Sequence, residues 1–272
     1  MTSMKDEINI FKVFYIVDIL IVFASFIVIW TNPAHTKMAE YYGWSTVGIF
    51  LILILDIIVT IEILDMATVE VGNPKYLLFR LGAPVVYILI GSLILGSLVG
   101  LYYYDRVLTL QKTYIVIPRF FSVQPLGQIV DAKTFDAFAS SYPVSGVEDT
   151  FWFGILFPTL LGILWLGFMV VKFPDLIAWG TSFVISVLVI SYAFSYIGHN
   201  VAYQGNLVAF QDAFYYGIYC SSSVGLTGNV LPCRIAHTMH NWAGTELYYR
   251  QNYQVTPPQG FIQFPPDYNY GG

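Results

Sequence analysis

The chain has 272 residues, of which 57% are hydrophobic and 11% are charged, whereas soluble domains have roughly 25% charged residues. The formal net charge is -5 and only 12 residues are lysine or arginine. The sequence therefore offers no basic patch that could follow a phosphate backbone, and nucleic acid is not expected as a partner. The two cysteines, Cys220 and Cys233, exclude a four-thiolate metal site and a disulfide-rich scaffold.

The hydrophobic residues are gathered in blocks of membrane length. This pattern predicts an all-α integral membrane protein, a bundle of about five transmembrane helices in the lipid bilayer. Residues 1–9 are expected to form a polar inner tail. Residues 10–104 are expected to form a three-helix membrane unit, with spans at about 10–30, 41–64 and 77–101.

The next part of the chain alternates polar and apolar segments. Residues 105–150 are more polar and are expected to form an outer loop region. Residues 151–199 are expected to form a two-helix membrane unit, with spans at about 151–171 and 175–197. Pro158 predicts a kink in the first of these spans, and Pro174 stands at the entry of the second, where a missing N–H is tolerated.

Residues 200–272 lose the membrane pattern and are expected to form an extended outer C-terminal segment packed on a partner. Gln204, Asn206 and Asp212 interrupt the moderately apolar stretch 201–219, for which a sixth span is the alternative. The end of the chain is rich in proline, glycine, glutamine and tyrosine, a composition that cannot bury a core of its own.

Basic residues in short loops predict the orientation of the spans. With five spans, one side collects Lys5, Lys12, Lys75, Arg80 and Lys172, whereas the single short loop on the other side has Lys37. The amino terminus is therefore expected inside and the carboxy terminus outside, in a plasma membrane or in the membrane of an energy-transducing organelle. Both cysteines then lie on the outer, usually oxidising side, which favours a disulfide between Cys220 and Cys233 over free thiols.

Two acidic residues, Asp18 and Asp56, lie inside apolar runs. Lipid cannot solvate a carboxylate, so such groups face protein, water or a partner charge. The predicted topology places the two carboxylates at similar depth, with Lys12 and Arg80 near the inner surface. We expect an intramembrane polar cluster of these four residues, and the alternative is a proton or cation path through the two acids.

Small residues recur every four positions in the third predicted span, at Ser92, Gly96 and Gly100. This face permits close approach of a second helix, in the same chain or in another one. The fifth predicted span carries hydroxyls at the same spacing, which are expected to make structural hydrogen bonds: Ser182 with Ser186, and Ser191 with Ser195.

All four histidines fall on the predicted outer side. Imidazole is a ligand for copper, haem iron or zinc, so His199, His237 and His240 are the candidate ligands of an outer metal site. The sequence has no HExxH motif beside them. We therefore expect no cofactor, and copper or haem is the alternative.

The sequence contains no nucleophile elbow, no P-loop and no dinucleotide-binding glycine motif. The function expected is a noncatalytic accessory or structural subunit of a multi-subunit membrane complex, such as an energy-transducing or oxygen-using one, whose partners are other membrane subunits. Two alternatives stay open. One is a redox or metal-binding membrane subunit that uses the outer histidines, and the other is a small ion-coupled transporter that uses Asp18 and Asp56.

Overall fold

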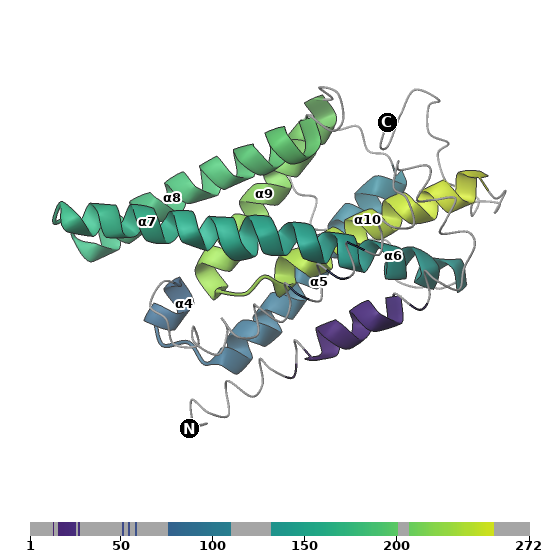
Figure 1. The fold of residues 1–272 in the computed structure, drawn as a ribbon, viewed down its shortest axis with the longest axis horizontal. Helices are drawn as coiled ribbons and strands as arrows, with labels where there is room; N and C mark the ends of the chain where they lie inside the picture. Colours follow the sequence, from purple (N-terminus) through teal and green to yellow (C-terminus); the bar gives the residue numbers. More distant parts are fainter. Residues whose placement is uncertain are drawn as a thin grey trace. The chain divides into compact units, whose positions relative to one another are not determined.

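The structure is a computed structural model, and it describes residues 13, 16–25, 27, 51, 54, 58, 76–109, 132–200 and 207–252. Of the described residues, 91% are helical and none lies in a strand. The predicted all-α class is therefore confirmed for this part of the chain (Figure 1).

The chain divides into two compact units. Unit 1 comprises residues 1–68, 94–147 and 234–272, and unit 2 comprises residues 69–93 and 148–233. The described helices of unit 1 are the helix Ile16–Ser25, the second part of α5 (Val85–Thr109), most of α6 (Ala132–Asp149) and most of α10 (Leu231–Asn252). Unit 2 contains α4 (Leu77–Arg80), the start of α5, α7 (Phe157–Val170), α8 (Asp175–Ala193), α9 (Leu207–Thr227) and two π-helical stretches, η2 (Thr150–Leu156) and η3 (Phe194–Asn200).

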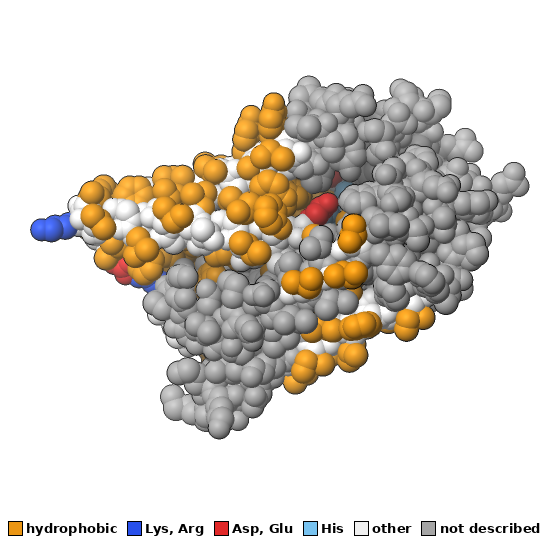
Figure 2. Space-filling model, viewed as in Figure 1, with side chains coloured by type: hydrophobic (Ala, Val, Ile, Leu, Met, Phe, Trp, Pro, Cys, Tyr) orange, Lys and Arg blue, Asp and Glu red, His pale blue; other side chains and the backbone are white. Residues whose placement is uncertain are grey.

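Three described helical segments are long and apolar enough to cross a membrane: Val85–Tyr104, Ser141–Val170 and Asp175–Ile197. Their outward side chains are large and hydrophobic, as along α7 and α8 (Figure 2), where Val170 is 81% and Leu176 is 73% exposed. Water would penalise such a surface and lipid would not. The three segments support a membrane protein. The predicted second span and most of the first lie outside the described residues, so the count of five remains a prediction.

The third predicted span begins at Val85 in the structure, not at Leu77. The short helix α4 ends in a turn in which Gly82 has a φ of 73°, a conformation that glycine adopts without strain. Pro84 then starts α5, because the N–H groups of Tyr87 and Ile88 donate to its carbonyl oxygen at 3.0 and 3.2 Å. The apolar run before Val85 is therefore interrupted by backbone geometry.

The fourth span is longer than predicted, because it starts at Ser141 within the predicted outer loop region. Residues 132–149 form the helix α6, and the π-helical stretch η2 joins it to α7. Pro158 lies at the start of α7, directly after η2, so it falls where the π-helical and α-helical stretches meet. The change in helix geometry at this point is the π-helical turn, a feature that often marks functional sites.

Helices α7 and α8 form an antiparallel hairpin closed by the turn at residues 171–174 (Figure 1). Lys172 adopts a φ of 62° and its N–H donates to the carbonyl oxygen of Met169 at 3.0 Å, as in a left-handed helix C-cap. Pro174 precedes α8 with a φ of -56°. The predicted boundaries of the fifth span are therefore confirmed.

The expectation of an extended segment after residue 200 is wrong for residues 207–252, which form α9 and α10. Gly217 and Gly225 explain why a moderately polar sequence can be helical here. A Cβ atom at Gly217 would lie 2.8 Å from the Cα of Ser191, and one at Gly225 would lie 2.5 Å from the ring of Phe183. The missing side chains let α9 pack directly against α8, and this packing stabilises the helix.

Candidate functional site

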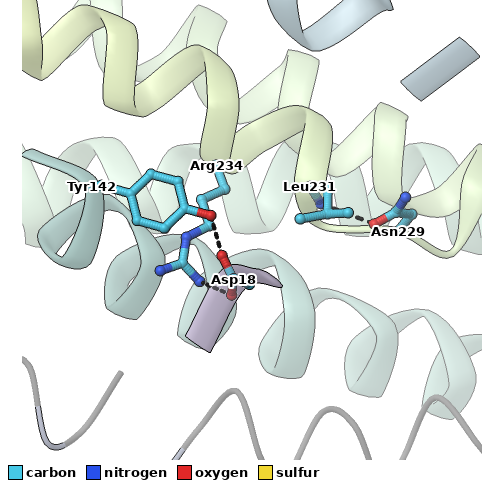
Figure 3. A network of polar contacts seen from close by, with 5 residues as sticks. All are labelled: Asp18, Tyr142, Asn229, Leu231 and Arg234. Atoms are coloured by element: carbon cyan, nitrogen blue, oxygen red, sulfur yellow. Dashed lines mark hydrogen bonds and ion pairs between the residues drawn. The ribbon is translucent and has the colours of Figure 1, made fainter. Parts of the chain in front are cut away.

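Asp18 and Arg234 are the most deeply buried charged residues described in unit 1. Together with Tyr142 they form a network of polar contacts, which we call the Asp18 network (Figure 3). The Arg234 guanidinium donates through Nη1 to Oδ2 of Asp18 at 2.7 Å, and the Tyr142 hydroxyl donates to Oδ1. The guanidinium carbon also lies 4.2 Å from the centre of the Tyr142 ring. The side chains of Asp18 and Arg234 are only 2% and 3% exposed.

The Asp18 network joins the helix Ile16–Ser25 to α6 and α10, which are far apart in the sequence. Asp18 and Arg234 are separated by 216 positions. An isolated buried charge would be very unfavourable, but here the carboxylate and the guanidinium compensate each other and the aromatic ring covers the cation. The network therefore fixes three segments of unit 1 to one another.

Of the predicted polar cluster of Asp18, Asp56, Lys12 and Arg80, the structure describes Asp18 and Arg80, and each has a charged partner outside the predicted set. Asp56 and Lys12 lie outside the described residues. Arg80 belongs to unit 2, where its Nη2 donates to Oδ2 of Asp175. Arg80 sits in α4, ahead of the turn that starts α5, and meets the first turn of α8.

Arg80 and Asp175 form a second charged contact, together with Trp165. The indole Nε1 of Trp165 donates to Oδ1 of Asp175 at 2.9 Å, and the Arg80 guanidinium lies 5.6 Å from the Trp165 ring centre. The Asp175 side chain is 46% exposed, so solvent weakens this pair far more than the pair of Asp18. The contact joins α4 to the α7–α8 hairpin within unit 2.

One face of α10 is polar and buried in unit 1. Arg234, His237, Thr238 and Asn241 recur at helical spacing, and the first three are at most 5% exposed. Asn241 donates through Nδ2 to the hydroxyl of Ser145 on α6 at 3.3 Å. A helix that lies on a surface would turn such residues to solvent, so their burial marks this face as a candidate site.

The predicted metal ligands are only partly described. His237 is 5% exposed, and His240 is half-buried with its ring edge-on to Tyr103, the centroids being 5.6 Å apart. His199 lies in η3 and its side chain is outside the described residues. Within the described residues no three His, Cys, Asp or Glu side chains are grouped as a metal would require, so copper and haem gain no support there.

The predicted disulfide is not formed. Cys220 and Cys233 are free, fully buried thiols, and the Sγ of Cys233 donates to the carbonyl oxygen of Cys220 at 3.6 Å. Their helices, α9 and α10, are not among the three apolar spans. Burial raises the pKa of both thiols, so they stay protonated and are poor nucleophiles near neutral pH.

Asp149 and Tyr216 form a buried polar contact, in unit 2, that the sequence did not single out. The Tyr216 hydroxyl lies 3.1 Å from each carboxylate oxygen of Asp149 and 2.8 Å from the carbonyl oxygen of Cys233. Burial, followed by the Asp149 charge, raises the pKa of Tyr216 well above 10.0. The phenol therefore remains a hydrogen-bond donor to the carboxylate at any physiological pH.

The small-residue face of the third predicted span is buried at Ser92, Gly96 and Gly100. A Cβ atom at Gly100 would lie 2.4 Å from the Sδ of Met239 in α10. The neighbour that Gly100 admits is thus in the same chain and in the same unit.

Comparisons of the chain with protein-family models, with curated proteins and with solved structures found no match.

Proposed function

We propose that the chain is a noncatalytic accessory or structural subunit of a multi-subunit membrane complex. The observation that carries this proposal is the use of the buried charges as contacts between helices. Asp18 is bound to Arg234 and Tyr142 across three helices, and Asp149 is bound to Tyr216 across two. Charges held in this way fix the packing of helices, a common role of polar groups in membrane proteins.

The outer surface of the described spans also suits a subunit surrounded by lipid and other helices. Large apolar side chains such as Ile163, Leu166 and Leu188 are about half exposed or more. Gly100 meanwhile serves a contact inside the chain, with Met239 of α10.

Extraction in a mild detergent tests the proposal. A tagged copy expressed in its native host should co-purify with other membrane proteins at constant stoichiometry. A matched variant, Arg234→Met, should lose these partners, because it releases the contact between three helices. A single monodisperse chain that is stable alone, or that turns over a substrate, would contradict the proposal.

A second candidate function is acid–base catalysis, and the buried polar face of α10 favours it. Of the four residue types on this face of α10, histidine, at His237, is the one whose side chain exchanges protons near neutral pH. Thr238 and Asn241 supply a hydroxyl and an amide within one helical turn, and the Thr238 hydroxyl has no partner among the described residues. An imidazole beside such groups can activate water and stabilise a developing negative charge, which are the requirements of hydrolysis.

Purified chain in lipid nanodiscs tests this second function. It would be supplied with a quenched fluorescent transmembrane peptide and, separately, with a fluorogenic acyl ester. His237→Gln should reduce turnover at least 100-fold, whereas His240→Gln, in the same helix, should keep most of it. Absence of turnover of both probes, or equal rates in the two variants, would refute the assignment.

A further inference from the structure

Unit 2 contains buried polar atoms that no protein group satisfies. Among the residues that the structure describes, the hydroxyls of Ser186, Ser221 and Ser223 and the Nδ2 of Asn229 have no hydrogen-bond partner. These four side chains are at most 4% exposed. Buried polar groups in proteins nearly always have a partner, and where protein supplies none the partner is ordered water or an ion.

Neighbouring hydroxyls show how such groups are satisfied when they stay on their own helix. Ser182, Ser191 and Thr227 each donate to a carbonyl oxygen four residues earlier, at 2.7, 2.6 and 2.6 Å. This bond is ordinary for hydroxyls in membrane helices. The hydroxyls of Ser186 and Ser221, on the same two helices, do not make it.

The packing of α8 against α9 brings Ser186 and Ser221 to the same level. Gly217 opposes Ser191, and Gly225 opposes Phe183, so the two helices run antiparallel. Ser221 lies midway between the two glycines and therefore faces the middle of the 183–191 segment, where Ser186 lies. The interface between α8 and α9 thus encloses hydroxyls from both sides.

A second buried row on α9 connects this interface to a carboxylate. Tyr216, Cys220, Ser223 and Thr227 recur at helical spacing and are all buried. From Thr227 to Tyr216 the row rises about 16 Å, at 1.5 Å per residue. At its end the Tyr216 hydroxyl contacts both oxygens of Asp149, which is fully buried. We call this row the polar lane.

We propose that the polar lane binds a chain of internal water molecules that hydrates the α8–α9 interface and reaches Asp149. Hydroxyls both donate and accept, which matches water, because each buried water needs two to four polar partners of both kinds. The lane offers hydroxyl and thiol groups in sequence. A lane of this kind gives a buried carboxylate access to protons, which is one of the roles of acids inside membrane proteins.

Radiolytic hydroxyl-radical labelling of the full chain in nanodiscs tests this proposal. Radicals form from water in place, so side chains beside bound water are oxidised even when bulk solvent cannot reach them. After division by the intrinsic reactivity of each side-chain type, the oxidation rates of Cys220 and Tyr216 should be at least ten times that of Leu161, which is buried in the apolar α7. Equal, slow oxidation of all three side chains would overturn the proposal.

Serine variants identify the source of the labelling. The double variant Ser221→Ala with Ser223→Ala should lower the oxidation rate of Tyr216 at least threefold, because it removes two groups that hold the water. Ser182→Ala is the matched control, since Ser182 is satisfied by its own helix, and it should leave the rate unchanged. An unchanged rate in the double variant, or an equal fall in the control, would refute a water chain held by these hydroxyls.

Discussion

Removing one charge of the Asp18–Arg234 pair should strongly destabilise unit 1. Asp18→Asn preserves the shape of the side chain but leaves the Arg234 guanidinium, only 3% exposed, without the Asp18 charge. Breaking a buried pair from one side costs about 3–5 kcal/mol. The contact of the guanidinium with the Tyr142 ring, at 4.2 Å, is present with or without the Asp18 charge and contributes on the order of 1 kcal/mol in both cases, so it does not replace the lost pair.

A double-mutant cycle separates the interaction from the loss of each side chain. Arg234→Met alone leaves the Asp18 carboxylate buried and should also cost about 3–5 kcal/mol, whereas an apolar or neutral replacement of both partners is often nearly neutral. The double variant should therefore be no less stable than either single variant. The coupling free energy is expected to be at least about 3 kcal/mol.

Equilibrium unfolding in mixed detergent micelles, followed by circular dichroism, measures these free energies. Arg80→Met is the matched control, because its partner Asp175 is 46% exposed and such pairs contribute roughly 0–1 kcal/mol. Two results would show that the Asp18 network is not the main contact of unit 1. One is a loss of unfolding free energy in the two single variants of the Asp18 pair that is smaller than the loss in the control. The other is a loss in the double variant that equals the sum of the two single losses.

Two further predictions concern α9 and its neighbours. Gly217→Ala should lower the free energy of unfolding by about 1–3 kcal/mol, since its Cβ would lie 2.8 Å from the Cα of Ser191. Gly180→Ala, with open space around it, should leave the free energy of unfolding unchanged or raise it by up to about 1 kcal/mol. Unfolding midpoints that shift equally in the two variants would contradict this packing. Cys220 and Cys233 should both react with maleimide after denaturation without reductant. Neither should react in the folded chain at pH 7, because burial raises the pKa of both thiols. An intact mass lower by two hydrogens would show instead that the disulfide is formed.

The membrane spans were the part of the fold that composition could predict. Helix Asp175–Ile197 agrees with the predicted fifth span, because Lys172 and Pro174 mark in the sequence where this apolar run begins. The third span was placed too early, since the leucines and the phenylalanine of residues 77–81 were read as part of the apolar run despite Arg80. The backbone turn at Gly82 and Pro84 separates these residues from α5.

The candidate site was much less predictable than the spans. Asp18 was identified because a carboxylate in an apolar run needs a partner, but Tyr142 and Arg234 lie 124 and 216 positions away. Nothing local in the sequence pairs them. The polar residues of α10 look like those of a solvent-exposed helix, and the regular spacing of Arg234, His237 and Asn241 was the available signal that they share a face.

The distribution of polarity in the described helices links the two candidate functions. Helices α7 and α8 turn hydrophobic side chains outward, whereas α10 turns Arg234, His237 and Thr238 inward. Arg234 is committed to Asp18 and so contributes to stability, while His237 lies one turn further along the same face and is the titratable group that the catalytic candidate requires. If His237 acts as the acid–base group, His237→Gln should lower turnover by more than the loss of folded protein accounts for, whereas the loss expected for Arg234→Met follows stability. A structural subunit requires the opposite, that both substitutions act through stability alone, so the two variants compared in one preparation distinguish the functions.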